Sequence, residues 1–80
     1  MTTNAKAPID HPLLGRVLTG RLRFHNMSLR SAAPLIGTSF NSIGRAARGE
    51  PVDLATYTLV CHWLQLSMDT FMIPTEERES

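Results

Sequence analysis

The amino-acid sequence predicts an all-α domain built from five short helices. Apolar residues recur with helical spacing in five segments, and no stretch shows the sustained alternation that a half-buried strand needs. A chain of 80 residues has room for one hydrophobic core. The predicted domain covers residues 10–73, between a flexible N-terminal arm at 1–9 and a disordered acidic tail at 74–80.

The first predicted helix begins at Asp10, whose carboxylate can cap free amides while Pro12 lies in the first turn. We expect the helix to end near Asn26. One stripe of this helix is apolar and is expected to face the core, with Leu14, Leu18 and Leu22.

The second predicted helix begins at Ser28, runs to Leu35 or Ile36, and closes at Gly37, which can adopt the left-handed conformation. Pro34 lies inside this segment, where it removes a backbone hydrogen bond at a cost of about 3 kcal/mol in a regular helix. Two outcomes are open: the helix kinks, or it begins late, with Ser31 as its cap.

The third predicted helix covers residues 40–47, with Thr38 or Ser39 as its cap and Gly49 as its end. Asp53 caps a fourth helix that is expected to form the centre of the core, with Leu54, Tyr57, Leu59, Val60, Cys61, Trp63 and Leu64. Ser67 caps a last helix. Its apolar residues either close the core or form the seam of a homodimer, and they are Met68, Phe71, Met72 and Ile73.

The charges are unevenly distributed along the chain, although the net charge is only +1. Residues 1–49 hold seven bases and one acid, and residues 50–80 hold six acids and one base. We therefore expect the folded domain to have one basic and one acidic face. A basic face attracts the phosphates of nucleic acids even when the net charge of the whole protein is close to zero.

Several function classes find no support in the sequence. Cys61 is the single cysteine, and the scattered histidines do not cluster with it as zinc ligands do. The chain carries no familiar catalytic motif and has little room for a substrate pocket, so we expect neither an enzyme nor a cofactor. No apolar run approaches the roughly 18 residues that span a bilayer. We expect a cytoplasmic protein with no small-molecule ligand and no membrane partner.

The segment SLRSAAPLIGTSFNSIGRAARG contains two short predicted helices joined by a glycine-containing turn. Such a pair fits the major groove of B-DNA when the second helix carries polar and basic outward residues. The chain from about Arg21 to Met72 resembles the Xre-type, Cro-like phage-repressor helix-turn-helix family. The matching landmarks are Met27, Ser28, Ala33, Gly37, Ser39, Ile43, Arg48 and Gly49, followed by Leu54, Tyr57, Leu59 and the segment LQLSMDTF.

The resemblance implies a compact five-helix domain with a helix-turn-helix formed by its second and third helices. It also implies that the start of the third helix faces the DNA bases, with Ser39, Phe40, Asn41, Ser42 and Arg45. Arginine suits guanine, asparagine suits adenine, and an apolar side chain suits a thymine methyl group. Phe40 either reaches the groove or packs in the core. The residues expected to contact phosphates are Arg21, Arg23, Ser28, Arg30 and Arg48.

These inferences lead to one leading hypothesis and two alternatives. The leading hypothesis is a sequence-specific transcriptional regulator, a repressor of phage or bacterial origin that binds a double-stranded operator through residues 39–47. The first alternative is a protein-binding module of the antitoxin or adaptor kind, marked by salt-insensitive association with its partner. The second is a recombination accessory factor, marked by binding at attachment sites and away from promoters.

Overall fold

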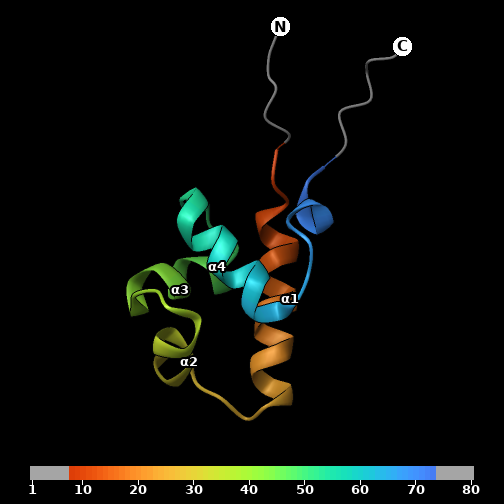
Figure 1. The fold of residues 1–80 in the computed structure, drawn as a ribbon. Coiled ribbons are helices and arrows are strands. Elements are labelled where there is room, and N and C mark those ends of the chain that lie inside the picture. The colour runs from red at the N-terminus through yellow and green to blue at the C-terminus, as the bar shows by residue number, and fades with distance from the viewer. Residues whose placement is uncertain (1–7, 74–80) are drawn as a thin grey trace, which may run out of the picture.

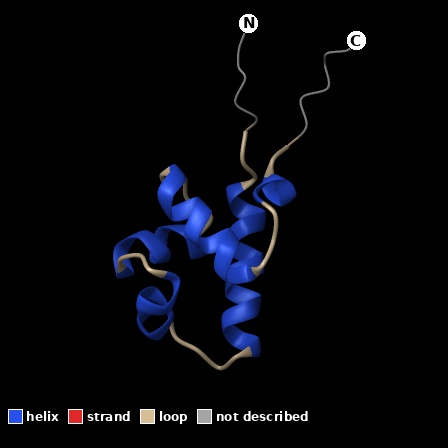
Figure 2. Ribbon diagram, viewed as in Figure 1, coloured by secondary structure: helices blue, strands red, loops and turns tan. Residues whose placement is uncertain are grey.

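The computed structural model describes residues 8–73, in which four α-helices and one 3-10 helix follow one another along the chain (Figure 1). They are α1 (His11–Phe24), α2 (Leu29–Ile36), α3 (Phe40–Ala47), α4 (Leu54–Leu64) and the 3-10 helix η1 (Met68–Phe71). The described residues form no strand (Figure 2), which confirms the predicted all-α class. Residues 1–7 of the predicted arm and the predicted tail at 74–80 lie outside the described residues.

Each α-helix begins at a side chain that the sequence predicts as its cap. A capping oxygen satisfies one of the amides that have no partner within the first turn. In each helix the oxygen accepts a hydrogen bond from the amide of the third helical residue. The four caps are Asp10, Ser28, Ser39 and Asp53.

Each α-helix also ends in the same way, at a residue with positive φ that reverses the chain. The reversing residues are Asn26, Gly37, Gly49 and Gln65. After each of them, the next amide donates a hydrogen bond of 2.8–3.1 Å to a carbonyl in the last turn, from Met27 to Leu22, Thr38 to Ala33, Glu50 to Arg45 and Leu66 to Cys61. These bonds satisfy carbonyls that lack a partner in the helix and return the chain to the core.

Pro34 lies inside α2, which begins directly after Ser28. The possibility that this helix starts late, with Ser31 as its cap, is therefore wrong. Pro34 is exposed and stands two residues before the end of the helix. Only the carbonyl of Arg30 loses its helical donor, and a carbonyl in an exposed turn can be hydrated instead.

The hydrophobic core lies between all four α-helices and η1, and α2 contributes Ala32, Ala33 and Ile36 to it. The predicted stripe on α1 is buried, and so is Ile43 on α3. Helix α4 supplies the centre, as predicted, although Leu54 in its first turn is 67% exposed. The largest fully buried side chains are Tyr57, Phe71, Leu14, Leu18, Ile43, Leu64, Val60 and Cys61. Burial raises the pKa of the Cys61 thiol, which disfavours the nucleophilic thiolate.

The last predicted helix is only one 3-10 turn long, because the chain leaves η1 at Met72 to pair with the segment before α1. Met72 forms an antiparallel bridge with Ile9. The amide of Asp10 donates to the carbonyl of Phe71 at 2.7 Å, and the amide of Ile73 donates to the carbonyl of Pro8 at 2.8 Å. The two ends of the described chain therefore lie side by side (Figure 1).

This pairing changes two expectations from the sequence. Pro8 and Ile9, predicted to belong to a flexible arm, are bonded to the domain, and Ile9 packs against the core. Phe71 belongs to the core with 1% exposure, whereas Met72 and Ile73 remain exposed. The apolar residues expected either to close the core or to form the seam of a homodimer are thus divided between the core and the surface.

The backbones of two helices approach each other closely at Gly15, where α1 crosses the end of α3. A Cβ atom at Gly15 would lie 2.8 Å from the carbonyl oxygen of Ala47 and 2.9 Å from that of Ala46. It would also lie 2.9 Å from the amide nitrogen of Gly49. All three are backbone atoms, so they cannot rotate away as the end of a side chain can. Only glycine fits this crossing.

Two substitutions on α1 test this contact. We expect Gly15→Ala to lower the free energy of unfolding by about 1 to 2 kcal/mol, because overpacking outweighs the gain in helix propensity. Gly20→Ala should raise it by about 0.5 to 1 kcal/mol, because a Cβ at Gly20 has no atom within 4 Å. Urea unfolding followed by circular dichroism measures both. Equal effects of the two substitutions would contradict the proposed packing constraint.

The raised pKa of Tyr57 leads us to expect that the folded protein loses stability in alkali. Its hydroxyl donates to the carbonyl of Met68, and burial raises the pKa of Tyr57 from 10.0 to about 12, with contact to the Cys61 thiol as the next cause. Because the pKa of Tyr57 is higher in the folded than in the unfolded state, the protonated hydroxyl stabilises the fold. Its contribution to the free energy of unfolding is complete below pH 10.0 and is lost as pH rises toward about 12.

The free energy of unfolding, measured at a series of alkaline pH values, should therefore fall more steeply for the wild type than for Tyr57→Phe. Tyr57 is the single tyrosine, so tyrosinate absorbance of the folded protein reports its titration alone. A titration midpoint at the ordinary pKa of tyrosine would contradict this account.

Candidate nucleic-acid interface

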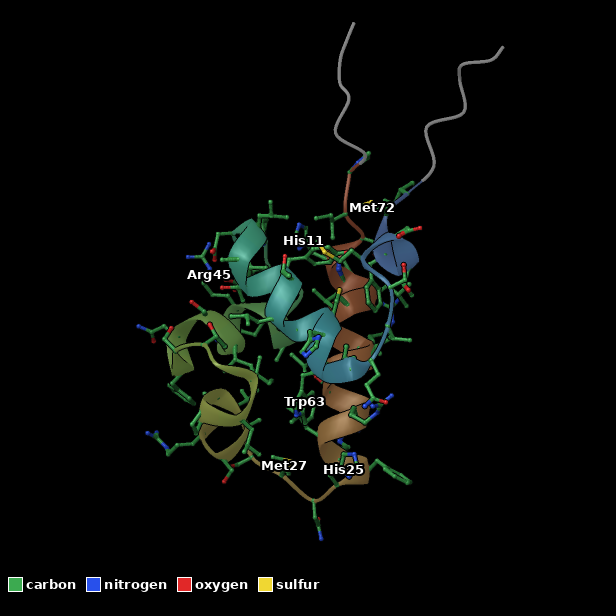
Figure 3. All side chains as sticks on the ribbon, in the orientation of Figure 1. His11, His25, Met27, Arg45, Trp63 and Met72 are labelled. Carbon is green, nitrogen blue, oxygen red and sulfur yellow. The ribbon has the colours of Figure 1, made fainter. Side chains whose placement is uncertain are left out.

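Helix α3 has one buried side and one exposed polar side. Ile43, Gly44 and Ala46 are buried. Asn41, Arg45 and Arg48 are exposed, and at 3.6 residues per turn their directions fall within about 60° of one another. Figure 3 shows Arg45 at the outer edge of the molecule. The structure therefore brings an amide and two guanidinium groups together on one helix face.

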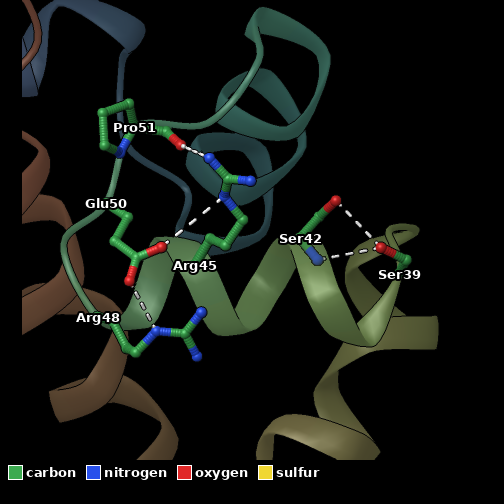
Figure 4. Close-up of polar contacts among 6 residues, drawn as sticks. All are labelled: Ser39, Ser42, Arg45, Arg48, Glu50 and Pro51. Carbon is green, nitrogen blue, oxygen red and sulfur yellow. Dashed lines mark hydrogen bonds and ion pairs between the residues drawn. The ribbon is translucent and has the colours of Figure 1, made fainter.

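Ser39 and Ser42 form the start of α3. The hydroxyl oxygen of Ser39 accepts a hydrogen bond from the amide of Ser42 at 3.0 Å, and its proton is donated to the Ser42 hydroxyl at 3.0 Å (Figure 4). Ser39 is thus engaged within the protein as the helix cap. Ser42 retains a hydroxyl proton that it can donate. Ser28 and Ser31 make the same pair of bonds at the start of α2.

Phe40 does not pack in the core, since 44% of its surface is exposed. The guanidinium carbon of Arg30, on α2, lies 4.5 Å from the centre of the Phe40 ring. Such a cation–π contact is worth about 0.5 to 1 kcal/mol at an exposed site. It joins the expected base-reading residue Phe40 to the expected phosphate contact Arg30, and the pair extends the exposed surface of α3 onto α2.

Glu50 binds both arginines in the last turns of α3 (Figure 4). Its carboxylate lies 3.0 Å from Nε of Arg48 and 3.9 Å from Nε of Arg45. Arg45 also donates from Nη2 to the carbonyl of Pro51 at 3.3 Å. Gly49, with φ of +80°, makes the reversal that places Glu50 there. Glu50 is not among the site residues predicted from the sequence, yet it lies in contact with two of them.

The contact with Arg48 has an electrostatic consequence. The hydrogen bond from Arg48, strengthened by the charges of both arginines, holds the pKa of the Glu50 carboxyl below its ordinary value. Glu50 is therefore ionised at neutral pH. Exposed ion pairs of this kind are weak, because water screens the charges and both side chains lose conformational freedom, so a strongly charged ligand can displace the carboxylate.

The expected phosphate contacts on α1 point in different directions. Arg21 is half-buried, and its Nη1 donates to the carbonyl of Leu64 at the end of α4, at 3.4 Å. Arg23 instead lines a shallow groove of about 500 Å³ between α1 and the end of α3. Arg16 and Arg48 line the same groove. We call this surface the basic groove; it also includes Thr19, Gly20 and Gly49.

The opposite side of α3 faces a second, smaller hollow of about 320 Å³. Arg45 and Ser42 line it together with Asp53, the cap of α4. The hydrogen bond from the Thr56 hydroxyl holds the pKa of the Asp53 carboxyl below its ordinary value, so this group is also ionised at neutral pH. The side of α3 that faces α1 is thus basic, and the side that faces α4 carries an acid.

Sequence reasoning missed Arg16 and Glu50 as members of this surface. Arg16 could have been found, because Arg16, Thr19 and Arg23 have the spacing of one helix face. Glu50 could have been found only with the turn geometry, since the reversal at Gly49 turns it back onto α3.

Among residues 8–73, no group of three His, Cys, Asp or Glu side chains gathers as metal ligands would. No helix of this part of the chain has the length and hydropathy needed to cross a membrane. No known family model matches the chain, and no curated protein matches its sequence significantly. The exposed face of α3 and the adjoining arginines are therefore the chief evidence for a function.

Proposed function

We propose that α2 and α3 form a helix-turn-helix that binds double-stranded DNA, and that the chain is a sequence-specific transcriptional regulator of the repressor type. Helix α3 enters the major groove. Asn41 and Arg45 read bases, Phe40 and Ser42 flank them, and Ser39 sets the start of the helix. The phosphate contacts are Ser28, Arg30, Arg23 and Arg48.

One observation carries the proposal: the exposed face of α3 combines an amide with two guanidinium groups on a short, capped helix. Asparagine and arginine are the side chains that make two hydrogen bonds at once to adenine and to guanine. The three-residue turn between α2 and α3, with Gly37 in the left-handed conformation, supports the assignment. The proposal leaves Arg21 out, because its guanidinium is directed at Leu64.

A selection experiment tests this function. Duplexes that bind the full chain are enriched from a random pool, and the preferred sequence is then titrated by fluorescence anisotropy. We expect Arg45→Ala and Asn41→Ala each to reduce discrimination between preferred and altered base pairs by about 1 to 3 kcal/mol. Arg21→Ala, which removes the same charge as Arg45→Ala from another surface, should leave that discrimination unchanged.

Three results would count against the proposal. Absence of binding to every duplex at low salt would favour the protein-binding module, because phosphate contacts strengthen as salt is removed. Unchanged base preference in both α3 variants would show that another surface reads the DNA. Preferred sequences confined to attachment sites would instead favour the recombination accessory factor.

Glu50 yields a prediction that also rests on this function. Glu50→Gln removes the carboxylate charge but keeps the shape of the side chain, so it frees Arg48 for phosphates and leaves Arg45 without a competing anion. We expect binding to random-sequence duplex to tighten by up to about tenfold and the salt dependence to become steeper. The affinity for the preferred sequence should rise by a smaller factor. The ratio of the affinities for preferred and random-sequence duplex should therefore fall.

Asp69→Asn provides the matched control, because it removes one acid on η1, where Asp69 contacts Ser67 and, among residues 8–73, no arginine. Equal tightening by Glu50→Gln and Asp69→Asn would show an effect of net charge. It would contradict local competition at Arg45 and Arg48.

A further inference from the structure

The outward side of α1 carries a row of residues that the core does not explain. Arg16 and Arg23 are exposed and lie seven residues apart, which separates them by about 10 Å along the helix. Neither forms an ion pair with an acid among residues 8–73. Both line the basic groove, into which Arg48 projects from the end of α3. Three positive side chains therefore share one surface, and Glu50 offsets the charge of Arg48 but not that of Arg16 or Arg23.

Gly20 lies between the two arginines and weakens the helix without any packing reason. A glycine inside a helix costs about 0.5 to 1 kcal/mol relative to alanine. Gly15, on the same helix, is required by its contact with the backbone of α3, but a Cβ at Gly20 would meet no atom within 4 Å. The missing side chain leaves the backbone of α1 open to close approach from the groove.

We propose that the basic groove is a second DNA contact, in which Arg16 and Arg23 bind the sugar–phosphate backbone beside the major groove that α3 occupies. This inference rests on the proposed function. Arg48 joins the two surfaces, because it belongs to the exposed face of α3 and also lines the groove. The charge favours the α1 side for the backbone, since Asp53 lies on the opposite side of α3.

Each residue has a distinct role in this contact. Arg16 and Arg23 are far enough apart to neutralise separate phosphates and so position the domain without reading sequence. Thr19 can donate its hydroxyl proton to a phosphate oxygen. Gly20 lets the duplex backbone lie against α1, where any side chain would hold it away. The groove therefore sets affinity and orientation, whereas α3 sets base preference.

The test titrates the full chain and its variants with a labelled random-sequence duplex at several salt concentrations. Each of Arg16→Gln and Arg23→Gln should weaken binding roughly fivefold to tenfold at low salt and reduce the slope of log affinity against log salt by about 0.9. Arg21→Gln is the matched control on the same helix. It removes an equal charge outside the groove and should change the slope much less.

Gly20→Ala tests whether the missing side chain matters for binding. If Gly20 has no role in binding, the variant should have a more stable helix and unchanged DNA affinity. Close approach of the DNA backbone predicts a more stable helix together with a few-fold loss of affinity, although no charge has changed. Unfolding and anisotropy measurements on the same preparation give both values.

The outcomes distinguish failure of the proposed function from failure of the groove contact alone. If the wild type binds no duplex at low salt, the proposed function fails and the groove contact fails with it. If the wild type binds DNA but Arg16→Gln and Arg23→Gln behave like Arg21→Gln, the groove contact alone is overturned. If Gly20→Ala leaves affinity unchanged, close backbone approach at α1 is wrong.

Discussion

The crossing of α1 over the end of α3 constrains the position of α3 and of the turn that follows it. At Gly15 the backbones of the two helices meet with no side chain between them. This contact directs the buried face of α3 toward α1, so Asn41 and Arg45 point outward. The reversal at Gly49 follows immediately and is itself packed against Pro12. A shift of α1 would therefore displace both the face of α3 and the turn that holds Glu50.

The domain is small, and local interactions define its helices. A capping oxygen begins each α-helix and a left-handed residue ends it, so groups that would be unsatisfied in an eight-residue helix find partners within the chain. The pairing of Ile9 with Met72 then ties the start of α1 to the segment after η1. The caps and tight reversals hold the short helix α3 in place. Its polar face therefore has a fixed geometry, which a precise binding surface requires.

The arginines among residues 8–73 have four different environments, one of which is the contact of Arg30 with the Phe40 ring. Arg21 is used within the fold, at the end of α4. Arg45 and Arg48 share Glu50, so their interaction with any anion competes with an existing pair. Arg16 and Arg23 face solvent along the basic groove. Net charge conceals these differences, because an arginine contributes the same unit to the total whether or not a neighbouring acid offsets it.

The sequence by itself predicted the four α-helices, because caps, left-handed residues and apolar spacing act over a few residues. It left open whether α2 starts at Ser28 or Ser31, and it predicted a full last helix where the structure has one 3-10 turn. It also identified Asn41 and Arg45 as outward residues once Ile43 was assigned to the core. The tertiary structure decided which residues become neighbours: the Arg30–Phe40 contact, the place of Glu50, the division between Arg21 and Arg23, and the pairing that ends η1. These depend on how helices cross and chains reverse, and spacing along one helix does not specify such long-range geometry.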